Sequence, residues 1–176
     1  MSETLLRVSG LKTYFYTASG VAKAVDGVSF SLNRGEVMGI VGESGCGKST
    51  LGRMIAGLEA PDSGCIWYKG QELTAKGGRG YSAVRTEIQM VFQDSYSSLN
   101  PRMTVGQIIG EGMLAHGMFH KNDGRMQEEV LRVMEECGLA PYFLHRFPHQ
   151  FSGGQRQRIG IARALAGNPE LIICDE

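Results

Sequence analysis

The chain has 176 residues, enough for one domain with a sizeable core, and its 18 lysines and arginines balance its 18 aspartates and glutamates. The net charge of zero leaves no basic footprint for nucleic acid, and no window approaches the roughly 20 consecutive apolar residues of a membrane-spanning helix. The four cysteines are scattered without a C-x-x-C pair, which favours a reduced, cytosolic protein.

The front of the chain has the pattern of a small antiparallel sheet followed by a buried strand. Apolar residues at 5–8, at 11–17 and alternately at 28–32 are typical of strands separated by turns. The continuous apolar run at 37–41 predicts a strand that is buried on both faces of a parallel sheet. A glycine-rich loop follows this run, and we expect a helix from residue 48 to about residue 58.

The middle of the chain changes from strand patterns to helix patterns. We expect a strand at 65–68, a flexible surface loop at 76–80 and another buried strand at 88–92. Beyond these strands, Asn122 can cap a helix whose apolar residues fall on one face, and Gly138 can end that helix.

The last part of the chain contains one more helix and one more strand. The helix is expected from about residue 152 to about residue 166, where Gly167 and Pro169 would end it. Residues 171–174 return to the buried-strand pattern. This order of elements indicates one α/β core with a β-rich addition at the front and a helical addition in the middle.

Residues 42–49 read GESGCGKS and match the phosphate-binding pattern G-x-x-x-x-G-K-[ST] at every specified position, between a predicted strand and a predicted helix. Glycines let successive backbone N–H groups point at phosphate oxygens, and the helix adds its positive dipole end. Lys48 is expected to bridge the β- and γ-phosphates, Ser49 to bind Mg2+ and Thr50 to donate to the α-phosphate. The residues expected to bind ATP here are Gly42, Glu43, Ser44, Gly45, Cys46, Gly47, Lys48, Ser49 and Thr50.

Two acids, Asp175 and Glu176, follow the apolar run at 171–174. An ATPase of this kind needs carboxylates at the carboxyl end of a parallel strand, where such sheets bind ligands. We expect Asp175 to hold Mg2+ through its water shell and Glu176 to polarise the attacking water. Strands commonly end in solvated acids, so this prediction depends on the phosphate loop earlier in the chain.

Residues 151–158 read FSGGQRQR and resemble the signature motif of ABC ATPases, usually written L-S-G-G-Q, with Phe151 in place of leucine. Physically this is a second helix N-terminus suited to an anion. The resemblance implies that two subunits pack head to tail, so that the signature of one covers the γ-phosphate held by the other. The residues implied in that contact are Ser152, Gly153, Gly154 and Gln155.

Two further positions follow from the resemblance. Gln93, directly after the strand expected at 88–92, is similar to the glutamine that touches Mg2+ and water in the family and carries movement to the membrane partner. Tyr14, Phe15 and Tyr16 lie where the family places a ring that stacks on adenine. Which of these aromatic residues does so, and which only cover the small sheet, stays open at this point.

Residues 93–105 and 145–150 resemble the corresponding segments of the ATPases of dipeptide, oligopeptide and nickel importers. Residues 93–105 would lie near the coupling helix of the permease, and their polar, proline-broken character suits an exposed docking loop. The implied partners are a second ATPase subunit, identical or different, the transmembrane permease subunits and, indirectly, a substrate-binding protein. The implied location is the cytoplasmic face of the cell membrane.

Motifs and resemblance together predict an α/β fold: a P-loop NTPase core of the RecA-like kind with an N-terminal antiparallel β subdomain and an inserted α-helical subdomain. Residues 1–93 would form the β subdomain and the P-loop core, 94–166 the helical subdomain with the signature, and 167–176 the return to the core. In the family a further strand with a switch histidine follows the two acids. The resemblance therefore implies a chain that is incomplete at its C-terminus and that hydrolyses ATP poorly when isolated.

The function predicted is that of an ATP-hydrolysing subunit that energises an ABC importer of peptides or a related small solute, with ATP and Mg2+ as cofactors. Its catalytic residues would be Lys48, Gln93 and Glu176, and its metal-binding residues Ser49, Gln93 and Asp175. One alternative is a soluble ABC-type ATPase coupled to a non-transport process such as phosphonate metabolism. Another is a chain that binds ATP without hydrolysing it.

Overall fold

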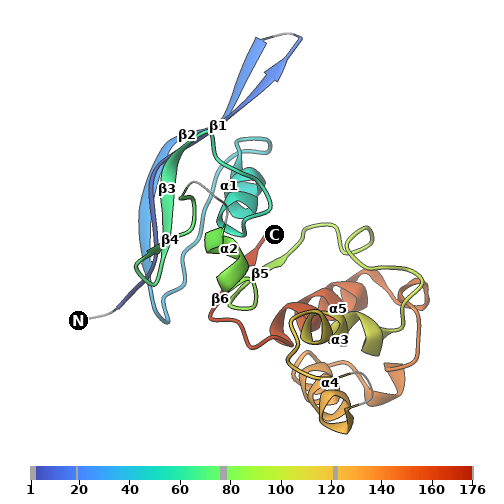
Figure 1. Cartoon of the computed structure of the whole chain (residues 1–176). Helices are drawn as coiled ribbons and strands as arrows, with labels where there is room; N and C mark the ends of the chain where they lie inside the picture. The colour runs from blue at the N-terminus through green and yellow to red at the C-terminus, as the bar shows by residue number, and fades with distance from the viewer. Residues whose placement is uncertain (1–2, 19, 76–78, 121–122, 176) are drawn as a thin grey trace. The chain divides into compact units, whose positions relative to one another are not determined.

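In a computed structural model the chain forms two compact units, Met1–Arg85 and Thr86–Glu176 (Figure 1). The structure describes residues 3–18, 20–75, 79–120 and 123–175. The helices and strands, in chain order, are β1 Thr4–Thr17, β2 Gly20–Asn33, α1 Lys48–Ile55, β3 Ser63–Tyr68, β4 Gln71–Glu72, α2 Arg79–Val84, β5 Ile88–Val91, α3 Val105–Ala115, α4 Gly124–Glu136, η1 Pro141–Phe143, η2 Pro148–Gln150, α5 Gly153–Leu165 and β6 Leu171–Cys174.

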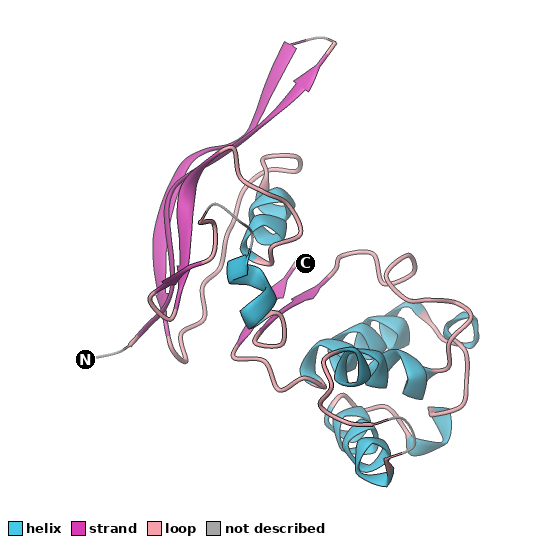
Figure 2. Cartoon of the chain, in the orientation of Figure 1, coloured by secondary structure: helices cyan, strands magenta, loops and turns pink. Residues whose placement is uncertain are grey.

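The first unit contains a four-stranded antiparallel sheet with the strand order β2-β1-β3-β4 (Figure 2). This confirms the antiparallel sheet predicted at the front of the chain. The register of β1 shifts between Val8 and Leu11, and buried residues of β1 and β3 form the core of the sheet: Leu6, Val8, Leu11, Ile66 and Tyr68. Strand β3 pairs with β1 only as far as Lys12, so beyond that residue β1 and β2 continue as a two-stranded arm.

The prediction of a buried strand at 37–41 is wrong. These residues form neither strand nor helix, and the side chains of Val37 and Val41 are each 96% exposed. A strand needs the backbone groups of a neighbour to bond with, and neither of the two sheets that the described residues form includes this segment. The apolar run therefore remains an irregular connection between β2 and α1.

Two other predictions in this unit need correction. Helix α1 ends before residue 58, because Gly57 adopts φ +71° and the N–H of Leu58 closes back on the carbonyl of Arg53 at 2.8 Å, a left-handed helix end. The loop predicted at 76–80 falls partly on residues 76–78, outside the described residues, and its last two residues begin helix α2. Tyr81 holds that helix by donating to the carbonyl of Met54 at 2.8 Å.

In the second unit, β5 and β6 pair in parallel, and helices α3, α4 and α5 pack on one another. The two helices predicted in this unit are confirmed as α4 and α5, but the cap of α4 is Asp123, and Asn122 lies outside the described residues. Gly138 ends α4 with φ +67°, as expected. Apolar side chains from all three helices form the core: Val105, Ile108, Ile109, Met113, Val130, Val133, Met134, Ile159 and Ala162.

The predicted burial of the last strand is only half right. Leu171 is buried, but Ile172 is 38% exposed and Cys174 is exposed, so β6 is not covered on both faces. Strand β5 ends at Val91, one residue earlier than expected. Among the described residues, no helix is long and apolar enough to cross a membrane.

Candidate functional site

The glycine-rich loop at residues 42–47 closes around the ammonium group of Lys48. This group donates to the carbonyl oxygens of Gly42 at 2.9 Å and Glu43 at 2.7 Å, and it lies 3.8 Å from the sulfur of Cys46. The N–H of Cys46 donates to the Glu43 carbonyl at 3.3 Å and tightens the turn. The loop therefore holds one positive charge inside an exposed run of backbone groups, which is the arrangement that receives phosphate oxygens.

Gly47 is the N-cap of α1, and its conformation explains why a glycine is needed there. Its φ of +97° is left-handed, and it has no side chain to accept an N–H from the first turn of the helix. A Cβ at this position would lie 1.9 Å from the carbonyl oxygen of Ala24 in β2. The loop thus begins its helix in direct backbone contact with the sheet, at a helix start whose dipole favours an anion.

We expect Gly47→Ala to destabilise the first unit more than Gly45→Ala does. Gly45 also has a left-handed φ, +79°, but nothing lies within 4 Å of the added methyl group, so the expected cost is about 1–2 kcal/mol. At Gly47 the backbone must also move away from Ala24. Urea unfolding of the two variants measures the difference, and equal midpoints would contradict the close contact between the loop and β2.

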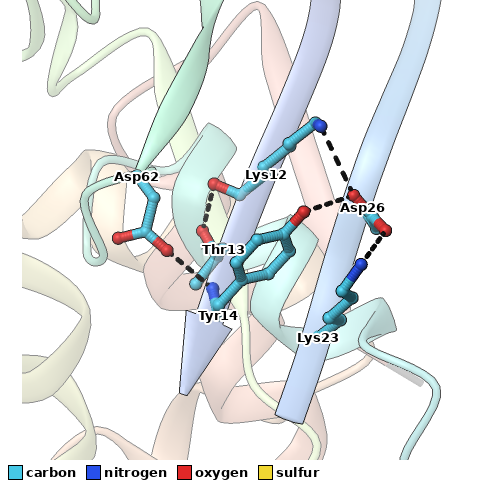
Figure 3. A network of polar contacts seen from close by, with 6 residues as sticks. All are labelled: Lys12, Thr13, Tyr14, Lys23, Asp26 and Asp62. Atoms are coloured by element: carbon cyan, nitrogen blue, oxygen red, sulfur yellow. Dashed lines mark hydrogen bonds and ion pairs between the residues drawn. The ribbon is translucent and has the colours of Figure 1, made fainter. Parts of the chain in front are cut away.

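Tyr14 is tied to its surroundings rather than free to meet a ligand (Figure 3). Its hydroxyl donates to Asp26 at 2.5 Å, its backbone N–H donates to Asp62 at 2.7 Å, and the ammonium group of Lys23 lies 5.3 Å from the centre of its ring. Lys12 and Lys23 form ion pairs with the two carboxylate oxygens of Asp26, at 3.6 and 3.3 Å. The hydrogen bond from Tyr14 lowers the pKa of Asp26, and the same bond raises the pKa of Tyr14.

Phe15 differs from Tyr14 in the face of the sheet that it occupies. Side chains alternate along a strand, so Phe15 shares its face with Thr13. Thr13 is buried, and its hydroxyl lies 2.8 Å from the sulfur of Met54 in α1. Phe15 is 46% exposed on this face, which is therefore the face of β1 that meets the helix after the phosphate loop.

In the second unit, Gln93 and Asp175 both follow the carboxyl end of a strand in the two-stranded sheet. Val91 pairs with Cys174 at the carboxyl ends of the parallel strands, and the N–H of Asp175 donates to the Val91 carbonyl at 3.0 Å. Gln93 is exposed two residues beyond that pair. The carboxyl end of the two strands thus carries an amide and a carboxylate, at the end where parallel sheets bind ligands. Glu176 lies outside the described residues.

The segment at 151–155 forms a capped helix start. Ser152 accepts the N–H of Gln155 at 3.3 Å, and the Gln155 side chain accepts the N–H of Ser152 at 3.1 Å, a reciprocal capping box. Phe151 is buried and packs edge-on against Phe143, with ring centres 4.9 Å apart. Gly153 and Gly154 follow in the first turn, and an added methyl group on either would meet nothing within 4 Å.

Two arginines of α5, whose contacts the sequence did not indicate, hold the segment after Gln93. Arg156 donates to the Phe151 carbonyl at 2.6 Å and lies 5.3 Å from the ring centre of Tyr96, which is 71% exposed. Arg163 is half-buried and donates to the carbonyl of Ser98 at 2.5 Å. The segment predicted as a docking loop is therefore exposed at its aromatic side chain and attached to the helix that begins at Ser152.

Comparison with known proteins gives a family and several relatives. The ABC transporter family matches residues 25–176. The oligopeptide transport ATP-binding protein AppF of Bacillus subtilis is 51% identical over 99% of this chain and 55% of its own length. The oligopeptide transport ATP-binding protein OppF of Escherichia coli is 46% identical over 99% of this chain and 54% of its own length. The chain thus spans about half the length of these curated relatives.

Solved structures agree with this result. The dimeric post-hydrolysis state of the ATP-binding cassette MJ0796, bound to ADP and Pi, has a TM-score of 0.88 at 26% identity and covers 97% of this chain and 73% of its own. The cbiO1 protein from Clostridium perfringens has a TM-score of 0.77 at 29% identity, over 99% of this chain and 66% of its own. The predicted P-loop fold with an antiparallel β subdomain is confirmed, as is the resemblance to peptide-importer ATPases. The chain belongs to the ABC transporter family.

Proposed function

We propose that the chain binds ATP with Mg2+ at residues 42–50 and hydrolyses it as the ATP-binding subunit of an importer for peptides or a related small solute. The observation that carries the proposal is the ammonium group of Lys48, held inside the loop by the carbonyls of Gly42 and Glu43. A cation fixed there, beside the N–H groups of a helix start, is suited to a polyphosphate. The named function of AppF and OppF supports the choice of transported solute.

The remaining polar residues of the site fit the chemistry of Mg2+, which prefers oxygen ligands. In the first unit, Ser49 offers a hydroxyl in the first turn of α1. In the second unit, Asp175 offers a carboxylate and Gln93 an amide oxygen at one sheet edge. Mg2+ would neutralise charge on the phosphates, while Lys48 holds them and Thr50 donates to the α-phosphate. Glu176 is proposed to orient the attacking water.

We assign adenine stacking to Phe15 rather than to Tyr14. Tyr14 uses its hydroxyl for Asp26 and its ring for Lys23, so it is already engaged. Phe15 is half exposed on the face of β1 that meets α1, the helix that the phosphate loop begins. An aromatic ring there can cover a base whose phosphates lie in the loop, because stacking accepts any base that presents its π-face.

We expect Phe15→Ala to weaken ATP binding by about tenfold or more, since stacking a base on an aromatic ring is worth ~1–3 kcal/mol. Mg-tripolyphosphate, which has no base, should bind as before. Tyr16→Ala is the matched control, because Tyr16 is more exposed than Phe15 and lies on the other face of the strand. Calorimetric titration of both ligands measures the two affinities. If Tyr16→Ala instead loses affinity for ATP but not for tripolyphosphate, Tyr16 rather than Phe15 stacks on the base.

The partners proposed are a second ATPase subunit, packed head to tail, and the permease of the importer, on the cytoplasmic face of the membrane; a substrate-binding protein would act indirectly. Ser152 and the two glycines after it would meet the nucleotide of the second subunit. The exposed ring of Tyr96, held by Arg156, favours the segment after Gln93 as the docking surface for the permease. The dimeric state named for MJ0796 supports the first of these contacts.

A turnover assay tests the proposed function. The protein is incubated with Mg-ATP, and released phosphate is measured with and without the permease. Hydrolysis that the permease stimulates supports an importer subunit. Binding of ATP without hydrolysis, with and without the permease, would contradict the enzymatic proposal, and copurification with soluble enzyme subunits instead of a permease would support the non-transport alternative.

A further inference from the structure

The arm formed by β1 and β2 beyond Lys12 has no third strand to support it. A two-stranded ribbon is at best marginally stable in water, so its shape must be fixed by cross-strand side-chain contacts or by a neighbouring element. Phe15, the residue that we assign to adenine, stands in this unsupported arm. The way the arm is held therefore decides where that ring lies relative to the phosphate loop.

A β-bulge at Ala24 connects the arm to the phosphate loop. Thr13 pairs with Val25, but Tyr14 pairs with Lys23, so Ala24 is an extra residue on β2. The carbonyl of this extra residue is the group that lies against Gly47, where a methyl group would approach it to 1.9 Å. The bulge thus places the backbone of β2 directly on the start of α1.

The same bulge gathers charged side chains around Tyr14 (Figure 3). Because one residue is inserted, Lys23 and Asp26 come to the same face of β2, opposite Tyr14 and Lys12 of β1. The Tyr14 hydroxyl reaches diagonally to Asp26, and the two lysines hold both oxygens of that carboxylate. We call these four residues, Lys12, Tyr14, Lys23 and Asp26, the cross-strand clamp.

Three contacts of residues 12–14 of β1 anchor the base of the arm. The N–H of Tyr14 donates to Asp62, which lies in the turn before β3. Thr13 donates to the Lys12 carbonyl at 2.9 Å and packs against Met54 of α1. Residues 12–14 are therefore fixed to the sheet, to the turn and to the phosphate-loop helix, and Phe15 is the next residue along the strand.

We propose that the cross-strand clamp positions Phe15 against the phosphate loop, so that Tyr14 and Asp26 set the affinity of the site for the base of a nucleotide without touching it. Tyr14 and Asp26 are positioning residues in this proposal, which rests on the proposed nucleotide site. Breaking the clamp frees the arm beyond the bulge, and the ring of Phe15 then has to be ordered when the base binds. The affinity of the loop for the phosphates is unchanged, because the loop itself holds them.

The test compares a ligand that has a base with one that has none. Wild type, Tyr14→Phe and Asp26→Asn are titrated calorimetrically with Mg-ATP and with Mg-tripolyphosphate. We expect both variants to bind ATP on the order of tenfold more weakly, as for the loss of a hydrogen bond to a charged group, and to bind tripolyphosphate unchanged. Glu3→Gln is the control, since it removes an exposed ion pair with Arg34 at the opposite end of the same two strands.

A second part of the experiment separates the positioning of Phe15 from a general loss of structure. In a Phe15→Ala background, adding Tyr14→Phe should cost no further ATP affinity, because the ring that the clamp positions is gone. Equal losses for ATP and tripolyphosphate, or full additivity with Phe15→Ala, would overturn the clamp. If wild type binds both ligands and only Phe15→Ala is selective, the nucleotide site stands and the clamp fails. A wild type that binds neither ligand would overturn both proposals.

Discussion

Lys48→Ala is expected to lower the affinity for ATP by about 100-fold or more, since truncating one member of a hydrogen-bonded charge pair costs ~2–5 kcal/mol. The ammonium group of Lys48 is bonded to two carbonyls of the loop, so the positive charge is already fixed where phosphates would arrive. Little conformational entropy is then lost when the ligand binds. The variant removes this charge and leaves the carbonyls of Gly42 and Glu43 facing the phosphates.

Calorimetric titration with Mg-ATP measures the effect, and Arg53→Ala is the matched control. Arg53 is an exposed cation of the same helix and pairs with Glu59 at 3.3 Å, so it carries equal charge without facing the loop. The control should bind ATP as wild type does. If Lys48→Ala binds ATP with unchanged affinity and unfolds at the same temperature as wild type, the assignment of residues 42–49 as the phosphate site is wrong.

The sequence predicted best those features that depend on neighbouring residues. The helix start near Ser152 was predicted, and the capping box that forms it needs only the glutamine three residues later; the predicted left-handed end of α4 needs only Gly138. The same local signal was present in Thr104 and Gln107, which cap α3, yet that helix was not predicted because the segment before it reads as a polar loop. Gly57 is a local signal of the same kind, because a glycine that adopts a left-handed φ ends a helix, and it marks the end of α1.

Features that depend on contacts distant in the chain could not be predicted. A continuous apolar run such as 37–41 says that both faces favour burial, but it does not say which strand supplies the hydrogen bonds. The difference between Phe15 and Tyr14 depends on Asp26, and no spacing rule pairs residues 14 and 26 across a strand pair whose register shifts at four places. Arg156 belongs to the signature segment at 151–158, whereas its contact with Tyr96 exists only in the folded unit.

The glycines after Ser152 show what a structure adds to a motif. Neither Gly153 nor Gly154 has a positive φ, and a methyl group on either would meet nothing within 4 Å. Packing inside the unit therefore gives no reason for glycine, although glycine in a helix costs stability relative to alanine. Close approach of another molecule to this helix start is the remaining physical reason, and it agrees with the proposed contact to a second subunit's nucleotide.

The largest effect on turnover is expected from Ser152→Asp. Aspartate caps a helix about as well as serine, so the N–H of Gln155 keeps its acceptor and α5 should remain folded. The new carboxylate, however, would face the γ-phosphate of the partner's ATP and repel it. We expect ATP-driven dimerisation to be lost and hydrolysis to fall on the order of 100-fold, as for loss of a contact made only in the assembled site.

Ser152→Asn is the control that separates charge from shape, because asparagine also caps helices well and is neutral. Light scattering with ATP measures the dimer, phosphate release measures turnover, and calorimetry measures ATP binding by the monomer. Both variants should bind ATP as monomers like wild type, and Ser152→Asn should retain most of the dimerisation. If Ser152→Asp weakens binding by the monomer itself, the signature lies in its own subunit's nucleotide site, and the head-to-tail arrangement is wrong.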